Sequence, residues 1–86
     1  MSYYVYMILT KINNRFISYV GYTNNIDKRV LLHNTSKGAK FTKGKFWKVI
    51  YSKKYLSKKK AMKEEFNLKK DRKKRNSIKL RFINSL

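Results

Sequence analysis

The sequence predicts a single small α+β domain, with two strands, a helix, a third strand, a second helix and a short third helix in that order. Apolar, β-branched and aromatic residues form runs at residues 3–10, 16–21 and 46–52, which is typical of buried strands. The segments after residues 25 and 57 follow N-cap candidates and space their apolar residues as helices do. We therefore expect a three-stranded antiparallel sheet flanked by helices, formed by residues 1–86 as one domain.

The first two runs are expected to pair as a hairpin. The polar segment between them, Lys11–Arg15, contains an Asn-Asn pair suited to a tight turn. A turn centred near residues 12 and 13 places Tyr6 opposite Tyr19 on one face of the sheet. A register shifted by two residues keeps both tyrosines on that face as diagonal neighbours, whereas a shift by one residue separates them.

The first helix is predicted to run from an N-cap at residues 23–25 to about Leu32. The cap candidates are Thr23, Asn24 and Asn25. The expected apolar stripe consists of Ile26, Val30 and Leu31. Arg29 and His33 are four residues apart, so they lie on one helix face at the edge of this stripe. Two tyrosines on paired strands, followed by this pair, indicate a group of side chains that handles phosphate.

A basic loop is predicted between the first helix and the third strand. Residues 34–38 end the helix, and Gly38–Lys45 form a loop that contains glycine and several lysines. The third strand is expected from Phe46 to Ser52. Trp47 is expected in the core or as an anchor of the loop, rather than as a platform for nucleobases.

The second helix contains two adjacent glutamates, of which one is expected to be functional. The helix is predicted from an N-cap at Ser57 to about Asp71. Its expected apolar arc consists of Ala61, Met62, Phe66 and Leu68. Glu65 falls inside this arc and Glu64 at its edge. A partly buried carboxylate is costly unless it is paired or binds a metal, which favours Glu65; a simple ion pair with Lys69 is the alternative.

Positive charge dominates the chain. Lysine and arginine number 23 against 4 acidic residues, which gives a formal charge of +19. Nucleic acid is the best-fitting polyanionic partner, because basic side chains that neutralise phosphates release condensed counterions. The expected contacts come from the basic loop and from the run before the third helix: Lys37, Lys40, Lys43, Lys45, Lys69, Lys70 and Arg72.

Composition disfavours several other classes of protein. The chain has no cysteine, which excludes disulfides and thiolate zinc sites and fits a reducing, intracellular compartment. No apolar run approaches the ~18 residues of a transmembrane helix, and no signal peptide is apparent. Four acidic residues are too few for the clustered carboxylates of a two-metal catalytic site.

Several motifs, in order, resemble the GIY-YIG endonuclease domain. Tyr4-Val5-Tyr6 stands where the family has Gly-Ile-Tyr, and Tyr19-Val20-Gly21 stands where it has Tyr-Ile-Gly. Residues 21–29 are similar to the family's next stretch, which ends on a catalytic arginine at Arg29.

The later motifs extend this resemblance over about residues 3–80. Residues 33–44, together with Trp47, are similar to the small single-domain bacterial members and to the catalytic domain of the Slx-type structure-specific nucleases. The segment Ala61–Glu65 is similar to the family's metal-binding stretch and places Glu65 at its glutamate.

The resemblance implies roles for five residues in phosphodiester hydrolysis. Tyr6 positions or deprotonates the attacking water, aided by His33, and Tyr19 contacts the phosphate or a metal-bound water. Arg29 stabilises the charge that develops on the scissile phosphate. Glu65 holds one divalent cation, Mg²⁺ or Mn²⁺. Which of Tyr6, His33 and Tyr19 accepts the proton stays open at the level of the sequence.

The resemblance further implies a metal-dependent DNA endonuclease that selects branched, flap or junction DNA in repair, recombination or replication. The alternative is a non-catalytic basic protein that keeps the fold and binds nucleic acid. Neither reading involves a membrane. The sequence does not distinguish a monomer from a homodimer, and it leaves room for a partner protein.

Overall fold

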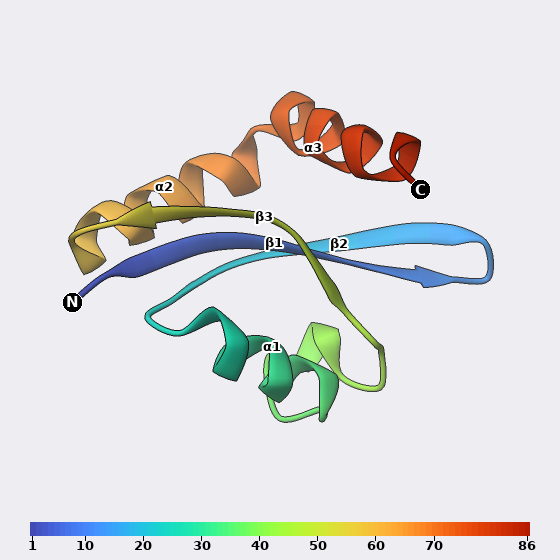
Figure 1. Cartoon of the computed structure of the whole chain (residues 1–86), viewed down its shortest axis with the longest axis horizontal. Coiled ribbons are helices and arrows are strands. Elements are labelled where there is room, and N and C mark those ends of the chain that lie inside the picture. The colour runs from blue at the N-terminus through green and yellow to red at the C-terminus, as the bar shows by residue number, and fades with distance from the viewer.

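The computed structural model describes all residues, 1–86, and consists of one sheet with helices on both faces (Figure 1). The strands are β1 (Tyr3–Ile12), β2 (Arg15–Thr23) and β3 (Lys48–Tyr55). The helices are α1 (Ile26–Asn34), α2 (Lys58–Lys70) and α3 (Arg72–Asn84), and a short 3-10 helix, η1 (Lys40–Thr42), lies in the loop before β3. The sheet is antiparallel with the order β2-β1-β3. The predicted α+β class and element order are therefore confirmed.

The hairpin turn sets which residues face each other across β1 and β2. Asn13 and Asn14 both have positive φ angles, 52° and 65°, as a two-residue turn that matches the strand twist requires. Tyr6 consequently pairs with Gly21, and Tyr19 pairs with Ile8. The turn predicted near residues 12 and 13 was thus one residue too early, and the two tyrosines are diagonal neighbours on one face rather than directly opposite.

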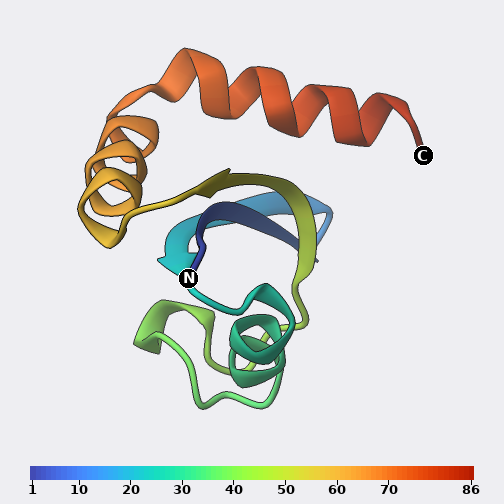
Figure 2. The same ribbon diagram turned by 60° about the vertical axis from the view of Figure 1, so that its left-hand side comes forward.

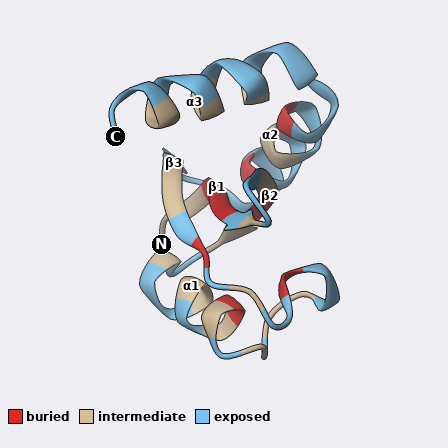
Figure 3. Ribbon diagram, turned by 90° about the vertical axis from the view of Figure 1, so that its right-hand side faces the viewer, coloured by how far each residue is buried: buried red, intermediate tan, exposed pale blue.

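The central strand β1 carries the core of the protein. Six consecutive residues, Val5–Thr10, are buried because helices cover both faces of the sheet. Val5 and Met7 face α2 and α3, whereas Tyr6 and Ile8 face the α1 side. Figure 2 shows α2 and α3 on one side of the sheet and α1 with its following loop on the other, and Figure 3 shows buried residues on β1, on α2 and near the end of α1.

Helix α1 is two residues longer than predicted and buries fewer apolar residues. The Asn25 side chain caps it by accepting a hydrogen bond from the Lys28 amide at 3.1 Å. Leu31 was expected in the apolar stripe but is 62% exposed. The last turn instead buries His33 completely.

The third strand begins and ends later than predicted. It extends through Tyr55, and Phe46, which was expected to begin it, is exposed. Trp47 just before the strand is buried, and its indole N–H donates to the Thr42 carbonyl at 3.0 Å. The expectation that Trp47 serves as a core residue and loop anchor is confirmed.

The second helix has its predicted limits, but its inward face differs from prediction. Ser57 caps it by accepting from the Lys60 amide at 3.1 Å. Ala61 and Leu68 are buried against the sheet, while Met62 and Phe66, which were expected in the apolar arc, are exposed. The inward face is therefore spaced i, i+3, i+4, i+7 from Ala61, and it includes both glutamates.

The third helix is longer than the short segment predicted, with 13 residues, Arg72–Asn84. Asp71 separates it from α2 and caps it by accepting from the Lys74 amide at 3.0 Å. Ile78 packs against the apolar cluster on the α2 side of the sheet. None of the helices is both long and apolar enough to cross a membrane.

Candidate active site

The glycine of the second motif makes room for the tyrosine of the first. Tyr6 is 1% exposed, and its ring runs across β2 at Gly21, its partner in the hairpin. A Cβ atom at position 21 would clash with the Tyr6 hydroxyl and would come within 2.6 Å of the ring carbon that carries it. Gly21 is therefore required by the path of the Tyr6 side chain.

A chain of three hydrogen bonds leads from Tyr6 into the loop before β3. The Tyr6 hydroxyl lies 2.8 Å from Nε2 of His33, and Nδ1 of His33 lies 2.7 Å from the hydroxyl of Thr42. The Thr42 hydroxyl donates to the Ala39 carbonyl at 2.8 Å. Tyr6, His33 and Thr42 are all almost completely buried, and no buried side-chain nitrogen or oxygen lacks a partner.

The directions of these bonds assign the proton positions on His33. The Ala39 carbonyl can only accept, so the single hydroxyl proton of Thr42 points to it. Thr42 can then only accept from His33, which places the imidazole proton on Nδ1. The Nε2 lone pair is left to accept the hydroxyl proton of Tyr6. The resting site therefore holds a neutral imidazole oriented as a proton acceptor toward the phenol.

Burial keeps both members of the pair neutral. Burial lowers the pKa of His33 below its ordinary value near 6.5, and the positive charge of Arg29 lowers it further. Burial raises the pKa of the Tyr6 hydroxyl above 10.0; Arg29 opposes this through hydrogen bonding and charge, while Tyr19 and Glu65 add to it. A phenol with a raised pKa does not stand as a preformed phenolate, so it needs an acceptor for its proton.

The loop that carries Thr42 is held in place at both ends. Gly38 passes directly over His33, where a Cβ atom would come within 2.6 Å of Nδ1. Asn34 accepts from the Trp47 amide at 2.6 Å and donates to the Trp47 carbonyl at 3.1 Å. Together with the indole of Trp47 on the Thr42 carbonyl, these contacts fix the position of the Thr42 hydroxyl.

Arg29 and Tyr19 lie around this hydrogen-bonded chain. The Tyr19 ring packs edge-on against the His33 ring at a centroid distance of 5.2 Å. Arg29 lies four residues before His33 on α1, and its positive charge lowers the pKa of both Tyr6 and His33. Neither of the two ion pairs in the protein involves Arg29, so no carboxylate of the protein competes with an anion for its guanidinium.

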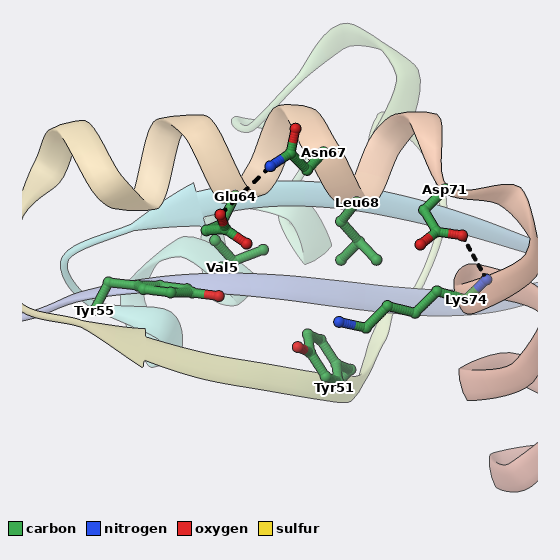
Figure 4. A pocket seen from close by; sticks show the side chains of 8 residues that line it. All are labelled: Val5, Tyr51, Tyr55, Glu64, Asn67, Leu68, Asp71 and Lys74. Carbon is green, nitrogen blue, oxygen red and sulfur yellow. Dashed lines mark hydrogen bonds between the residues drawn. The ribbon is translucent and has the colours of Figure 1, made fainter.

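The two adjacent glutamates of α2 face different surroundings. Glu65 raises the pKa of Tyr6, and its side chain, 18% exposed, pairs with Lys69 at 3.6 Å. Glu64 pairs with Lys60 at 3.5 Å and accepts from Asn67. It lines a separate pocket between α2 and β3 (Figure 4).

The pocket beside Glu64 is distinct from the Tyr6 site, because its tyrosines come from β3. Tyr51 and Tyr55 of β3 line it, and burial followed by the charge of Glu64 raises the pKa of Tyr55. The expected Glu65–Lys69 pair is present, and the charge of Glu65 makes the smallest contribution to the raised pKa of Tyr6.

The predicted nucleic-acid contacts lie in three kinds of surroundings. Lys69 lines a cleft beside Tyr19, and Lys45 lies over the Phe41 ring in the basic loop. Lys37, Lys40, Lys43 and Arg72 are exposed on the surface. Lys70 lies over the exposed ring of Phe66 on α2 and not in the Tyr19 cleft.

Two residues that contribute to this region were missed by sequence reasoning. Thr42 carried no signal, because its partner His33 is nine residues away and only the folded loop brings them together. Phe41 stood in a lysine-rich loop, and an aromatic residue among lysines is a recognisable sign of a nucleic-acid surface.

The arrangement is suited to hydrolysis of a phosphate ester. It combines a phenol with a proton acceptor, a guanidinium that has no carboxylate partner and matches phosphate oxygens, and one carboxylate, Glu65, whose charge contributes to the pKa of the phenol. No group of three or more histidine, cysteine or acidic residues gathers in the protein. A metal bound here would therefore have one carboxylate, with water and substrate as its remaining ligands.

The chain is similar to known proteins over most of its length. The GIY-YIG catalytic domain matches residues 2–79. A UPF0213 protein of Oceanobacillus iheyensis is 41% identical over 69 residues, which cover 79% of this chain and 77% of its own. A UPF0213 protein of Staphylococcus haemolyticus is 40% identical over 69 residues, which cover 79% and 80%.

A solved structure is also similar to this chain. The solution NMR structure of a UPF0213 protein from Bacillus halodurans is 35% identical, covers 93% of this chain and 85% of its own, and has a TM-score of 0.48. The domain match spans both tyrosine motifs, the arginine and histidine of α1 and the glutamate of α2. The chain therefore belongs to the GIY-YIG family of endonuclease domains.

Proposed function

We propose that the protein is a metal-dependent DNA endonuclease, and that it selects branched or single-strand-containing DNA over sequence. The observation that carries this proposal is the hydrogen-bonded chain from Tyr6 through His33 to Thr42. A protein that only binds nucleic acid has no need of a buried imidazole oriented to accept a proton from a phenol. Family membership supports the nuclease class.

Tyr6 relays a proton in this mechanism and does not act as a preformed base. The attacking water gives its proton to the Tyr6 oxygen while the Tyr6 proton moves to Nε2 of His33. The water oxygen bonds to phosphorus as the bond to the leaving 3′ oxygen breaks, and the leaving oxygen takes a proton from solvent. Thr42 keeps its hydrogen bond to Nδ1 throughout, so the imidazolium forms without reorganisation of the loop.

Arg29 and Tyr19 bind the reacting phosphate. Arg29 has no carboxylate partner, and its planar donors match two phosphate oxygens. It also favours the ionised form of Tyr6 and disfavours the protonated form of His33. Tyr19 packs against the His33 ring and presents its hydroxyl to the phosphate or to a bound water.

Glu65 is the residue that would hold a divalent cation. Its carboxylate is mostly buried, and its one ion-pair partner, Lys69, is a flexible surface side chain. Mg²⁺ keeps several waters and is commonly held by one or two carboxylates plus substrate phosphate, so this single donor fits. When bound, the metal neutralises charge on the phosphate and its leaving oxygen.

The charge of the domain supports DNA as the substrate class. The net charge of +19 and the exposed lysines provide many phosphate contacts. Such contacts position a nucleic acid but do not read its sequence. Recognition through phosphate positions favours substrates that are distinguished by shape, such as flaps, forks and junctions.

The test is cleavage of labelled DNA with and without Mg²⁺ or Mn²⁺. The substrates are a linear duplex, a single strand, a 5′ flap, a replication fork and a four-way junction. The variant is Glu65→Gln, and Glu64→Gln is its matched control, because each glutamate pairs with a lysine four residues away on the same helix. We expect metal-dependent cleavage at the branch point, lost in Glu65→Gln and kept in Glu64→Gln.

Two results would contradict the proposal. Equal cleavage activity of the two variants would show that Glu65 has no specific role in the reaction. Salt-sensitive binding of every substrate, with no product in either metal, would leave a non-catalytic nucleic-acid-binding protein with the GIY-YIG fold.

A further inference from the structure

A cleft runs along the edge of the sheet directly beside Tyr19. It is lined by Ser18, Tyr19, Val20, Phe41, Lys69 and Arg75. Three regions of the fold therefore meet here: strand β2, the helix η1 and the junction of α2 with α3. The cleft shares Tyr19 with the candidate active site, and Lys69 in its wall pairs with Glu65. DNA held with its phosphate at that site would pass next to this cleft.

Phe41 provides an exposed aromatic wall in a fixed position. The residue is 52% exposed, although Thr42, which follows it, is completely buried. Its ring stacks on Tyr19 with planes 19° apart and centroids 6.1 Å apart, and it also contacts the ring of Trp47 at 6.2 Å. Because the adjacent residue is anchored by His33, the ring is held in place without being buried.

The surroundings of this ring are positive. Lys69 and Arg75 line the cleft, and the ammonium of Lys45 lies over the Phe41 ring, 5.5 Å from its centroid, so a base that stacks on this face takes the place of the ammonium. None of the residues that line the cleft is acidic. A flat aromatic face bordered by cations is the arrangement that proteins use for single-stranded nucleic acid, in which bases stack on the ring and cations bind the backbone.

We propose that this cleft binds an unpaired nucleotide next to the scissile phosphate, with its base stacked on Phe41 and its phosphate bound by Lys69 and Arg75. This inference rests on the proposed function and gives it a structural cause for substrate choice. In a duplex both faces of each base are covered by neighbouring bases. Only an unpaired base, as at a branch, in a flap or in a single strand, can leave the stack and offer a free face to Phe41.

The test is binding in EDTA, where no cleavage can interfere. A short fluorescent single strand and a blunt duplex of the same sequence are compared by anisotropy for the unmodified protein and for Phe41→Ala. We expect affinity for the single strand to fall about ten-fold, as loss of one stacked base predicts, and affinity for the duplex to stay within about two-fold. Phe41→Trp should restore the preference for the single strand.

Two further variants separate stacking from packing. Phe41→Leu keeps an apolar side chain without an aromatic face, so it should lose the preference as Phe41→Ala does. Phe66→Ala is the matched control, because Phe66 is also an exposed phenylalanine with a lysine over its ring, at 4.8 Å, but lies outside the cleft. It should bind both probes as the unmodified protein does.

A second readout reports the stack directly. A 2-aminopurine base placed at the branch of a 5′ flap should be quenched on binding, and the quenching should disappear in Phe41→Ala and Phe41→Leu. Unchanged quenching, an unchanged single-strand preference in Phe41→Leu, or equal losses on the single strand and the duplex would each overturn the proposal. Thermal melting of each variant confirms that it is folded.

The outcomes for the cleft and for the nuclease are distinguishable. Selective, Phe41-dependent binding of the single strand without any cleavage would support the proposed nucleotide site and contradict the proposed nuclease activity. Metal-dependent cleavage with no effect of Phe41 on binding would support the nuclease activity and contradict the nucleotide site.

Discussion

The two faces of strand β1 differ in what they bury. On the α2 side, Val5 and Met7 join a wholly apolar cluster with Ala61 and Leu68. On the α1 side, Tyr6 begins a buried chain of hydrogen bonds that continues through His33 and Thr42. Both faces are almost completely shielded from water.

This difference indicates that one strand serves two purposes through its two-residue alternation. Burial of apolar area stabilises the fold roughly in proportion to that area. A buried polar chain adds less net stability, because its bonds replace bonds to water, but it fixes proton positions that a solvated group would exchange freely. Substitutions on the α2 side should therefore mainly lower stability, and substitutions on the α1 side should mainly lower the cleavage rate.

The largest expected effect is on catalysis, from Tyr6→Phe. Removal of the hydroxyl deletes the proton relay, so the single-turnover cleavage rate should fall about 100–10,000-fold, equivalent to ~2.7–5.5 kcal/mol in the barrier. Stability should fall by only about 1–3 kcal/mol, because Nε2 of His33 is left without its partner.

Tyr51→Phe is the control for this change, because Tyr51 lies on the opposite face of the sheet and faces α2 and α3. It should cleave at the unmodified rate. If Tyr6→Phe keeps a rate within about ten-fold of that control, the relay is not part of the reaction.

The second largest effect is on stability, from Met7→Ala, one residue along the same strand. Met7 is fully buried in the apolar cluster, so its truncation should lower the free energy of unfolding by about 2–5 kcal/mol in urea titration. The cleavage rate of the folded fraction should stay within about three-fold. Ile78→Ala, at the half-buried rim of the same cluster, is a milder variant should Met7→Ala unfold. A rate loss as large as that of Tyr6→Phe would show that the two faces are not separable.

The third prediction concerns Thr42, which touches no substrate in the proposed mechanism. Thr42→Val keeps the shape of the side chain but removes the acceptor for the Nδ1 proton of His33. The tautomer with its proton on Nδ1, which accepts from Tyr6 at Nε2, is then less favoured. Groups that orient a metal-bound imidazole are worth about 10–100-fold, and we expect a loss of that size here. Thr42→Ser should restore the rate.

The chain offers a direct readout of this positioning role. His33 is its only histidine, so ¹⁵N NMR of labelled histidine reports one imidazole without ambiguity. The unmodified protein and Thr42→Ser should show protonated Nδ1, and Thr42→Val should show a shift toward protonated Nε2. An unchanged tautomer in Thr42→Val would assign its rate loss, if any, to packing.

The smallest expected effect is the pH dependence of stability. The pKa of His33 is lower in the folded protein than its ordinary value near 6.5, mainly because the ring is buried. As pH falls below about 6.5, the unfolded chain takes up a proton that the folded chain does not, so the free energy of unfolding decreases by at most about 1.4 kcal/mol per pH unit.

The measurement is urea unfolding at several pH values between about 7.5 and 5, the range in which histidine titrates. The same series on His33→Asn gives the contribution of all other groups, and the slope assigned to His33 is the difference. Identical slopes in the two proteins would mean that His33 titrates normally, and a ¹⁵N titration of His33 would then show a pKa near 6.5.

Local sequence signals predicted most of the fold. The element order, the cap at Ser57 and the sharing of one face by Tyr6 and Tyr19 follow from short-range rules about capping and alternation, and Asn25 is one of the three candidates predicted to cap α1. The errors lie where the choice depends on tertiary packing. Leu31 is exposed because the end of α1 buries a histidine instead, a choice that its helical spacing could not reveal.

The sequence indicated residue types for the candidate site but not their hydrogen bonds, because those bonds join segments that are distant along the chain. Glu65 was preferred over Glu64 for its inward position, and its role as the metal-binding acid stays a prediction. The apolar arc used for that selection was nevertheless wrong, since Met62 and Phe66 are exposed. Both glutamates are partly buried on the inward face of α2, so the helical pattern does not separate them.

By itself, the sequence determined the elements, the excess of positive charge and the residue types available for phosphate chemistry, since these depend on neighbours along the chain and on composition. The tertiary structure alone decided which nitrogen of His33 carries the proton and which loop holds it there. That choice requires Gly38 to pass over His33 and Thr42 to reach Nδ1 from nine residues away. Hydrogen bonds act only at about 3 Å, so their partners are known only once the chain has folded.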